Sequence, residues 1–164
     1  MTGKMLKVSL SGFALDHSAS SPVIVLSPEN SDRVLPIWIG HFEAYAIAME
    51  LSNFQMKRPQ THDLLARVIS ALDGKVEKVE ITELKDRTFY AKIYITVNGE
   101  TREIDARPSD SIALALKANA PIYAAEDLFQ ITEDQGMPEK INDPETLKER
   151  LWNIDPEDFG KYSL

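Results

Sequence analysis

Two short segments of the chain share one order of chemically useful side chains. Each begins with Arg-Pro and continues with a hydroxyl side chain and an aspartate, in residues 58–63 (RPQTHD) and 107–111 (RPSDS). Proline suits the first turn of a helix, Thr or Ser caps that turn, and an aspartate complements the positive end of the helix dipole. The two segments therefore predict two helix starts that carry polar side chains.

Arg58 and Arg107 are not explained by capping, because a cation at the positive end of a helix is unfavourable unless an anion lies beside it. An arginine next to free backbone N–H groups is typical of a phosphate-binding site. We therefore predict that Arg58 and Arg107, with Thr61 and Ser109 beside them, bind a phosphate-containing substrate. The structural alternative is that both arginines pair with the aspartates of these segments or with another carboxylate at the edge of the core.

Carboxylates gather around the second segment, where a predicted strand runs into a predicted helix. Asp105 and Asp110 flank the Arg-Pro pair, and Glu103 shares a strand face with Asp105 because side chains alternate along a strand. Mg²⁺ and Mn²⁺ prefer such oxygen ligands, and a metal-bound water can become the nucleophile in phosphodiester hydrolysis. Asp105 and Asp110 are therefore the predicted metal ligands. A surface ion-pair network with Arg102 and Arg107 explains the same residues without a metal.

His62 and Glu43 also lie in the first turns of predicted helices. The helix dipole favours the neutral form of a histidine at that end, which suits His62 to accept a proton or bind a metal. Glu43 either complements the dipole of its own helix or takes part in the chemistry. For His62 the structural alternative is a capping or packing role. His17 and His41 lie far from His62 in sequence, so the histidines alone do not predict a metal site.

The elements that must position these side chains follow from the apolar pattern and the turn residues. The helical pattern predicts helices over residues 41–54, over residues 61–72 with Thr61 as N-cap, from Pro108 until Pro121 stops it, and over residues 145–152. The strand pattern predicts strands over residues 5–15, 22–27, 34–39, 76–84, 88–97, 100–106 and 122–125. Residues 126–142 are predicted to form a loop.

The same pattern predicts which side chains are buried. Helix 41–54 has apolar residues on both sides and is predicted to be largely buried, with Trp38 and Phe42 in the core. In the strand over residues 100–106, Ile104 and Ala106 should point inward, and the opposite face should carry Glu103, Asp105 and Arg107.

The order of elements predicts the fold class. Asn98-Gly99 is a strong hairpin signal between two of the strands, and Pro36 requires an edge strand or a bulge. Strands and helices do not alternate regularly, so an α+β domain is favoured over a doubly wound sheet. We expect one compact domain over residues 1–164 with a mixed, mostly antiparallel sheet and three to four helices. Residues 126–164 should pack on it as a C-terminal loop and helix.

The composition excludes several classes of protein and several kinds of site. A net charge of −8 over 164 residues argues against a protein that coats nucleic acid by charge neutralisation. The absence of cysteine excludes disulfides, thiolate metal sites and cysteine nucleophiles. No apolar run approaches the ~20 residues that span a bilayer, no secretion signal is recognised, and no phosphate-binding Gly-rich loop is present. We expect a soluble cytoplasmic protein without membrane contact or organic cofactor.

Several ordered blocks together resemble the bifunctional nuclease family. They are LPIWIG with Phe42-Glu43-Ala44, RPxTHDLL from Arg58, Thr88-Phe89-Tyr90-Ala91, IDARPSDSIALA from Ile104, and Pro156-Glu157-Asp158-Phe159. The resemblance runs through nearly the whole chain. It implies a compact α+β domain, oligomers in at least some members, and a nuclease activity on DNA and RNA. The polar positions of its blocks are Arg58, Thr61, His62, Asp63, Asp105, Arg107, Ser109 and Asp110.

The leading hypothesis is a metal-assisted nuclease that hydrolyses phosphodiester bonds of DNA and RNA. Asp105 and Asp110 would hold Mg²⁺ or Mn²⁺, Arg58 and Arg107 would bind phosphate, and the water would be oriented by His62 or Glu43. This hypothesis requires all of these groups to converge in one cleft. The first alternative is a non-catalytic regulatory or scaffolding domain that self-associates as a dimer or larger homo-oligomer. The second is a binding module for a small anionic ligand.

Overall fold

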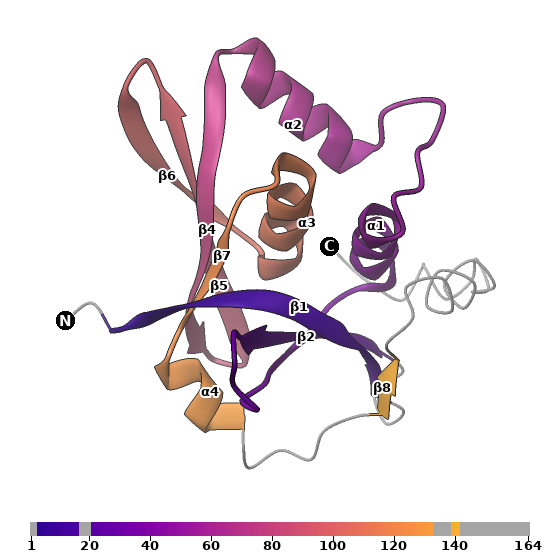
Figure 1. Cartoon of the computed structure of the whole chain (residues 1–164), viewed down its shortest axis with the longest axis vertical. Helices are drawn as coiled ribbons and strands as arrows, with labels where there is room; N and C mark the ends of the chain where they lie inside the picture. The colour runs from indigo at the N-terminus through magenta and orange to yellow at the C-terminus, as the bar shows by residue number, and fades with distance from the viewer. Residues whose placement is uncertain (1–2, 17–20, 133–138, 142–164) are drawn as a thin grey trace.

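One mixed sheet organises the chain in the computed structural model, which describes residues 3–16, 21–132 and 139–141. The strands follow the order β3-β2-β1-β7-β4-β5-β6, and the short β8 pairs with β1 (Figure 1). β4 and β7 are parallel, and the other recorded pairs are antiparallel. The strand bounds are β1 Met5–Asp16, β2 Ser21–Pro28, β3 Leu35–Trp38, β4 Gly74–Lys85, β5 Thr88–Val97, β6 Glu100–Ala106, β7 Ile122–Ala125 and β8 Glu139–Ile141.

Four helices lie in the described part of the chain: α1 His41–Leu51, α2 Thr61–Ala71, α3 Pro108–Ala118 and α4 Asp127–Thr132. α3 packs on β4 and β5, and both α1 and α2 contact α3 (Figure 1). α4 contacts β3 and β7 instead. This arrangement confirms the predicted α+β domain with a mixed, mostly antiparallel sheet.

The hairpins of β4, β5 and β6 form where the turn residues predict them. Asn98 and Gly99 adopt positive φ angles of 52° and 80°, as a tight two-residue hairpin requires. Asp86 and Arg87 also have positive φ angles, 50° and 62°, between β4 and β5. Along β5, alternate residues are buried against α3, and the intervening ones face the other side of the sheet. Pro36 was predicted to need an edge strand or a bulge, and the edge is what the structure has, because β3 is the outermost strand.

α3 is the central helix of the domain. Pro108 occupies its first turn and Asn119 ends it in a left-handed conformation with φ 54°, which is a common way to terminate a helix. Its inner face joins the core that the sheet supplies from β4, β5 and β7, through Ile112, Leu114 and Ala115, all at 0% exposure. Core packing directly after the first turn of α3 therefore fixes the position of its polar residues.

The predicted burial around α1 is partly wrong. α1 ends at Leu51 rather than Phe54, because Ser52 caps it and Asn53 turns left-handed at φ 53°. Its inner side is buried as expected, but Phe42 is 62% exposed and Trp38 is 36% exposed, so neither belongs to the core. An apolar residue in a periodic pattern is buried only if another element covers it.

The prediction for α2 is correct in position and wrong in the residue that caps it. Gln60 rather than Thr61 is the N-cap, and its backbone N–H donates to Asp63 Oδ2 at 2.9 Å. No residue of α2 is buried. The exposed apolar side chains of this helix and its C-cap, here called the α2 stripe, are Leu64 at 56%, Leu65 at 39%, Val68 at 45% and Leu72 at 68%. Ile104, predicted to point inward, is 44% exposed because β6 is an edge strand.

The predicted loop over residues 126–142 is also wrong. This segment contains α4 and β8, whose formation depends on partners far away in the sequence. Leu128 and Phe129 of α4 are buried at 3% and 0% exposure, and β8 pairs with residues 13–15 of β1. The helix expected over residues 145–152 lies outside the described residues. None of the helices in the described ranges is long and apolar enough to cross a membrane.

Candidate functional site

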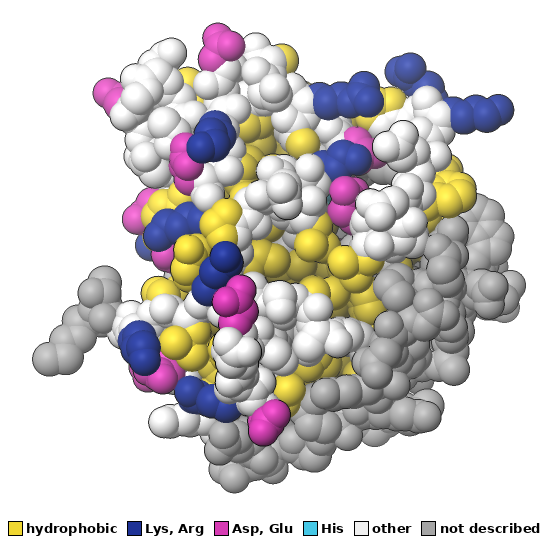
Figure 2. All heavy atoms as spheres, viewed as in Figure 1, with side chains coloured by type: hydrophobic (Ala, Val, Ile, Leu, Met, Phe, Trp, Pro, Cys, Tyr) yellow, Lys and Arg dark blue, Asp and Glu magenta, His cyan; other side chains and the backbone are white. Residues whose placement is uncertain are grey.

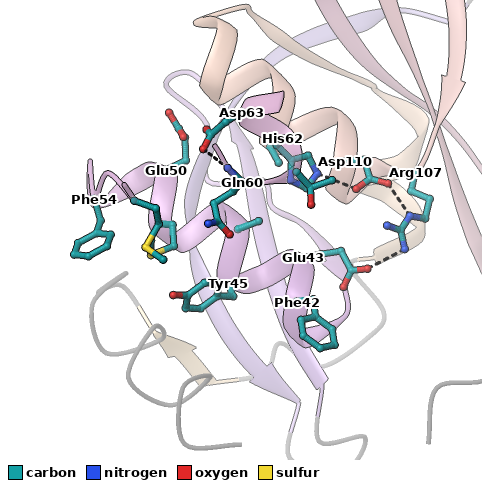
Figure 3. Close-up of a pocket in the computed structure, with 15 residues that line it drawn as sticks. Phe42, Glu43, Tyr45, Glu50, Phe54, Gln60, His62, Asp63, Arg107 and Asp110 are labelled. Carbon is teal, nitrogen blue, oxygen red and sulfur yellow. Dashed lines mark hydrogen bonds and ion pairs between the residues drawn. The ribbon is translucent and has the colours of Figure 1, made fainter. Parts of the chain in front are cut away.

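The first turns of α2 and α3 meet beside α1 and enclose a cavity of about 310 Å³, here called the His62 cavity (Figure 3). One side of it carries polar groups from all three helices, namely Glu43, His62, Arg107 and Asp110. The remaining lining includes the apolar side chains Phe42, Tyr45, Met49, Phe54 and Met56. A cavity with a few convergent polar groups beside an apolar wall is typical of a small-molecule or substrate site.

A continuous chain of polar contacts runs along the polar side. Arg107 Nη1 donates to Glu43 Oε1 at 2.9 Å, and Arg107 Nε donates to Asp110 Oδ2 at 2.8 Å. The other Asp110 oxygen, Oδ1, lies 3.0 Å from His62 Nε2. Figure 3 shows Asp110 between His62 and Arg107, with Arg107 turned toward Glu43. Three helices are thereby connected through four side chains.

Asp110 is ionised in this arrangement. The hydrogen bond from His62, together with the Arg107 guanidinium, holds the pKa of the Asp110 carboxyl at about 2, although partial burial acts in the opposite direction. An ionised carboxylate only accepts hydrogen bonds, so His62 Nε2 carries the shared proton. In the neutral imidazole, Nδ1 is then the proton-accepting nitrogen, and no described residue hydrogen-bonds it. Asp110 therefore fixes a tautomer of His62 that can act as a base.

Arg107 combines structural contacts with free donors. Its side chain is 64% exposed, and Asp110, followed by Glu43, raises the pKa of its guanidinium. A guanidinium has five N–H donors, and only two are used by these carboxylates, which leaves three for a ligand. The structural alternative that pairs an arginine with nearby carboxylates is thus confirmed for Arg107. Its exposure leaves room for a ligand as well.

Gly40 allows Glu43 to reach this chain. The residue precedes α1, and a Cβ at this position would overlap Glu43 Oε2. Because of this overlap, any side chain at position 40 would displace the Glu43 carboxylate. The conformation of Glu43 that accepts the hydrogen bond from Arg107 therefore depends on a glycine three residues earlier.

A second ion-pair cluster borders the same cavity and includes Asp63. Lys117 Nζ lies 2.7 Å from Asp63 Oδ1 and 3.5 Å from Glu50 Oε2. The hydrogen bond from Lys117, followed by that from the Gln60 backbone, lowers the pKa of Asp63. Lys117 was not among the predicted site residues, although it lies on α3 two turns after Asp110, a spacing that places both on one side of a helix.

The structure brings together five of the eight predicted site residues. Glu43, Thr61, His62, Arg107 and Asp110 all line the His62 cavity. These residues lie on three helices whose packing against one another is tertiary, and the contacts join positions 48 and 64 residues apart in sequence. Ser109 lines a second cavity next to it, on the other side of Arg107 and Glu43.

Asp105 and Arg58 do not join this cluster. Asp105 pairs with Lys92 in the β5–β6 ladder, and cross-strand partners share a face of the sheet. Since α3 packs on the opposite face, through Ala91 and Ile93, Asp105 points away from the helix that carries Asp110. Arg58 is exposed in the connection between α1 and α2 and makes no hydrogen bond or ion pair with another described residue.

The expected metal ligands are accordingly not assembled as a pair. Both oxygens of Asp110 already accept hydrogen bonds, from His62 and Arg107, and Asp105 lies on the other face of the sheet. Within residues 3–16, 21–132 and 139–141 there is no group of three or more His, Asp or Glu side chains that could hold a metal ion. The donors present in the His62 cavity therefore fit a hydrogen-bonded acid–base site better than a Mg²⁺ or Mn²⁺ site.

Comparison with known proteins places these residues inside a recognised domain. A family model described as the bifunctional nuclease domain matches residues 24–136, which include every predicted site residue. An uncharacterized protein of Mycobacterium tuberculosis is 36% identical over 164 residues, covering 94% of this chain and 98% of that protein. Bifunctional nuclease 1 of Oryza sativa subsp. japonica is 30% identical over 112 residues, or 66% of this chain and 34% of the plant protein. Bifunctional nuclease 1 of Arabidopsis thaliana is 26% identical over 115 residues, which cover 68% of this chain and 35% of the plant protein.

Proposed function

The chain belongs to the bifunctional nuclease domain family, and we propose that it hydrolyses phosphodiester bonds of DNA and RNA in the His62 cavity. The proposal is carried by one observation, the hydrogen-bonded chain Glu43–Arg107–Asp110–His62 along the polar side of that cavity. It supplies an oriented base that can activate water and a cation with free donors that can stabilise charge on phosphate oxygens. The names of the distant plant relatives agree with this chemistry.

His62 is the proposed general base. A water molecule in the cavity attacks phosphorus while His62 Nδ1 takes one of its protons. The bond between phosphorus and the leaving nucleoside oxygen breaks, and that oxygen takes a proton from solvent. The imidazolium then releases its proton to bulk water, which restores the neutral base. Asp110 keeps Nε2 protonated throughout and stabilises the positive charge that His62 carries in between.

Arg107 is the proposed phosphate-binding residue. Its three unused N–H groups can donate to the non-bridging phosphate oxygens, where negative charge is concentrated during attack. Glu43 holds the guanidinium from the α1 side and Asp110 holds it from the α3 side, so its position is set before substrate arrives. Thr61 lines the same cavity at the start of α2 and supplies a further hydroxyl donor.

Binding of a divalent metal ion stays a prediction. It is supported by the negative charge of the cavity rather than by an assembled set of metal ligands. Carboxylates outnumber cations along the cavity, where Glu43, Glu50, Asp63 and Asp110 face Arg107 as the lining cation. Their combined field opposes a polyanion unless cations offset it. Proton transfer to His62 and phosphate binding by Arg107 need only side chains of this chain, and the effect of Mg²⁺ or Mn²⁺ is tested separately in the assay.

The test is a nuclease assay on single- and double-stranded DNA and on RNA, with Mg²⁺, Mn²⁺ or chelator. Wild type is compared with His62→Gln and Asp110→Asn, and Asp105→Asn serves as the matched control because it removes the same charge outside the cavity. We expect both cavity variants to lower kcat about 10²-fold or more, the usual range for a lost general base. The control should stay within about twofold, as expected of a surface change. Cleavage indifferent to His62→Gln in a folded protein contradicts the proposal.

A second candidate function, self-association, is favoured by the α2 stripe. We propose that a second copy of this chain covers the stripe, with the two α2 helices antiparallel across a two-fold axis. The ends of α2 are complementary for that pairing, because Lys57 and Arg58 precede the helix and Asp73 follows it, all exposed. Figure 2 shows Lys and Arg side chains gathered at the end of the molecule where the α1–α2 connection lies. An antiparallel pair brings these cations toward the acidic end of the partner helix.

Sedimentation velocity tests this interface directly. Val68→Glu places a charge in the centre of the α2 stripe, and Ser70→Glu places the same charge on an exposed position of α2 outside it. We expect wild type and Ser70→Glu to sediment as dimers or larger oligomers and Val68→Glu to sediment as a monomer. A monomeric wild type at micromolar concentrations, or an oligomer unaffected by Val68→Glu, argues against the stripe as an interface.

A further inference from the structure

A second cavity of about 270 Å³, here called the Arg87 cavity, lies next to the His62 cavity. It is enclosed by the end of β3, the start of α1, the turn between β4 and β5, and the first turn of α3. Glu43 and Arg107 line both cavities and form the boundary between them. Any extended substrate that contacts Arg107 from one side therefore has a second hollow within reach on the other.

The N-terminal end of α3 opens into the Arg87 cavity. Arg107, the N-cap, makes no side-chain capping hydrogen bond, and Pro108 in the first turn has no backbone N–H. The Ser109 backbone N–H is therefore left uncapped at the positive end of an 11-residue helix, which attracts anions. Geometry of this kind is common to many helices and does not by itself identify a ligand.

The Ser109 hydroxyl has no hydrogen-bond partner in the described part of the chain, and this points to a ligand. Ser109 lines the Arg87 cavity, is only 6% exposed, and its hydroxyl makes no hydrogen bond with any residue that the structure describes. Its neighbour Ser111 is 0% exposed, and its hydroxyl donates to the Arg107 carbonyl oxygen at 2.9 Å. Buried hydroxyl groups in proteins are nearly always hydrogen-bonded, because leaving one unpaired is destabilising. The Ser109 hydroxyl is therefore available to bond water or a ligand that enters the Arg87 cavity.

Arg87 supplies a cation at the same place. It lines the cavity from the β4–β5 turn, is exposed, and forms no ion pair or hydrogen bond with another described residue. Its backbone adopts φ 62°, a left-handed conformation that an arginine adopts rarely and that fixes the direction of this turn. Among the described residues that line the cavity, Glu43 is the one acidic side chain, and its charge is offset by its ion pair with Arg107.

We propose that the Arg87 cavity is a phosphate-binding subsite. Phosphate oxygens accept hydrogen bonds from the Ser109 hydroxyl, the Ser109 backbone N–H and the Arg87 guanidinium, and a base attached to the phosphate lies against Trp38 and Phe89. Two sources share this chemistry: the phosphodiester that flanks the cleaved one in a polynucleotide, and the phosphate of a free nucleotide. The first source rests on the proposed nuclease function, because it requires the scissile phosphate at Arg107. The phosphate subsite itself does not depend on nuclease activity.

The experiment measures binding without cleavage. Inorganic phosphate and a nucleoside monophosphate are titrated into the full chain by calorimetry, and backbone amide shifts are followed by NMR. Wild type is compared with Ser109→Ala and with Arg87→Asn, which removes the guanidinium and keeps a residue that tolerates a left-handed backbone. Arg102→Gln is the matched control, because it removes one exposed arginine from β6 outside both cavities.

We expect inorganic phosphate to shift the Ser109 amide signal and to bind at least about tenfold more weakly to Arg87→Asn, as the loss of a charge-assisted hydrogen bond predicts. Ser109→Ala should weaken binding about threefold to tenfold, consistent with loss of one neutral hydrogen bond, and should fold normally because the removed hydroxyl has no protein partner. The control should bind as wild type does. No binding at millimolar phosphate, or binding unchanged in both variants, overturns the subsite.

An oligonucleotide arm separates the two sources and the two proposals. If Arg87→Asn raises KM for oligonucleotide cleavage and leaves kcat unchanged, the occupant is the flanking phosphodiester. If it weakens only nucleoside monophosphate binding, the occupant is a free nucleotide. If wild type cleaves nothing yet binds phosphate in an Arg87-dependent manner, the nuclease function fails and the subsite stands.

Discussion

The carboxylate of Asp110 should stabilise the folded chain at neutral pH and lose that effect in acid. Its pKa is lowered from 3.8 to about 2 by His62 and then Arg107, so the folded state holds the ionised form more strongly than the unfolded chain does. A group with a lowered pKa contributes stability above its unfolded pKa and loses it as the pH falls through the folded value. The effect is therefore complete above about pH 5 and disappears near about pH 2.

The expected size follows from the shift. One pKa unit corresponds to about 1.4 kcal/mol, so the difference between 3.8 and about 2 corresponds to about 2.4 kcal/mol. The Asp110 side chain is 31% exposed, and solvent screening reduces the estimate to about 2 kcal/mol at neutral pH. Near about pH 3 the linkage relation leaves roughly half of that, or about 1 kcal/mol.

Urea unfolding, followed by circular dichroism, measures this contribution. The free energy of unfolding is compared between wild type and Asp110→Asn near neutral pH and near about pH 3. We expect Asp110→Asn to be less stable by about 2 kcal/mol at neutral pH and by about 1 kcal/mol in acid. Asp105→Asn is the control, because Asp105 is exposed and makes no ion pair with a described residue. It should change stability by less than about 0.5 kcal/mol.

An equal stability gap between wild type and Asp110→Asn at both pH values would contradict a charge-dependent contribution from Asp110. A constant gap would mean that Asp110 contributes through packing or a neutral hydrogen bond rather than through its charge. A gap that widens in acid would require Asp110 to be destabilising as a carboxylate, contrary to its contacts with His62 and Arg107.

Three further predictions follow from single contacts. Gly40→Ala should displace the Glu43 carboxylate from Arg107 and lower nuclease kcat. The free energy of unfolding should change by under about 1 kcal/mol, because Arg107 is 64% exposed, and a crystal structure of the variant with an intact ion pair would contradict this prediction. Asn119→Ala should lower the free energy of unfolding by about 1 kcal/mol in thermal unfolding, because Asn119 ends α3 at φ 54°, whereas Asn119→Gly should not. Equal stabilities of the two variants would exclude backbone strain as the cause. Phe129→Ala should cost about 3–5 kcal/mol in urea unfolding, and a loss below about 1 kcal/mol would mean that α4 is not part of the core.

Local sequence was sufficient where a few adjacent residues determine the backbone. Asn98-Gly99 predicts the turn between β5 and β6, and the bounds of both strands agree with the alternation of their apolar residues. Pro108 predicts the start of α3 for the same reason, because its fixed φ and missing N–H suit a first turn. The family blocks were likewise readable, and they agree with the family match over residues 24–136.

Burial was less predictable, because it depends on what covers an element. The apolar residues of α2 occur at helical spacing and form a helix, yet Leu64 and Leu72 stay more than half exposed. Residues 127–132 belong to a segment predicted to be a loop and nevertheless form α4, because Leu128 and Phe129 reach the core. In both cases the deciding contacts come from elements distant in sequence.

By itself, the sequence determined the fold class, the strand and helix starts around Arg107, the family, and the residue types available for chemistry. Only the tertiary structure decided which of those residues meet. Asp105 and Asp110 are five positions apart, yet they face opposite sides of the sheet, because the chain leaves β6 at Ala106 and α3 packs on the other face. His62 and Glu43 are distant in sequence from Asp110 and Arg107, and helix packing places them in direct contact. Sequence separation does not measure distance once side-chain direction and helix packing are set.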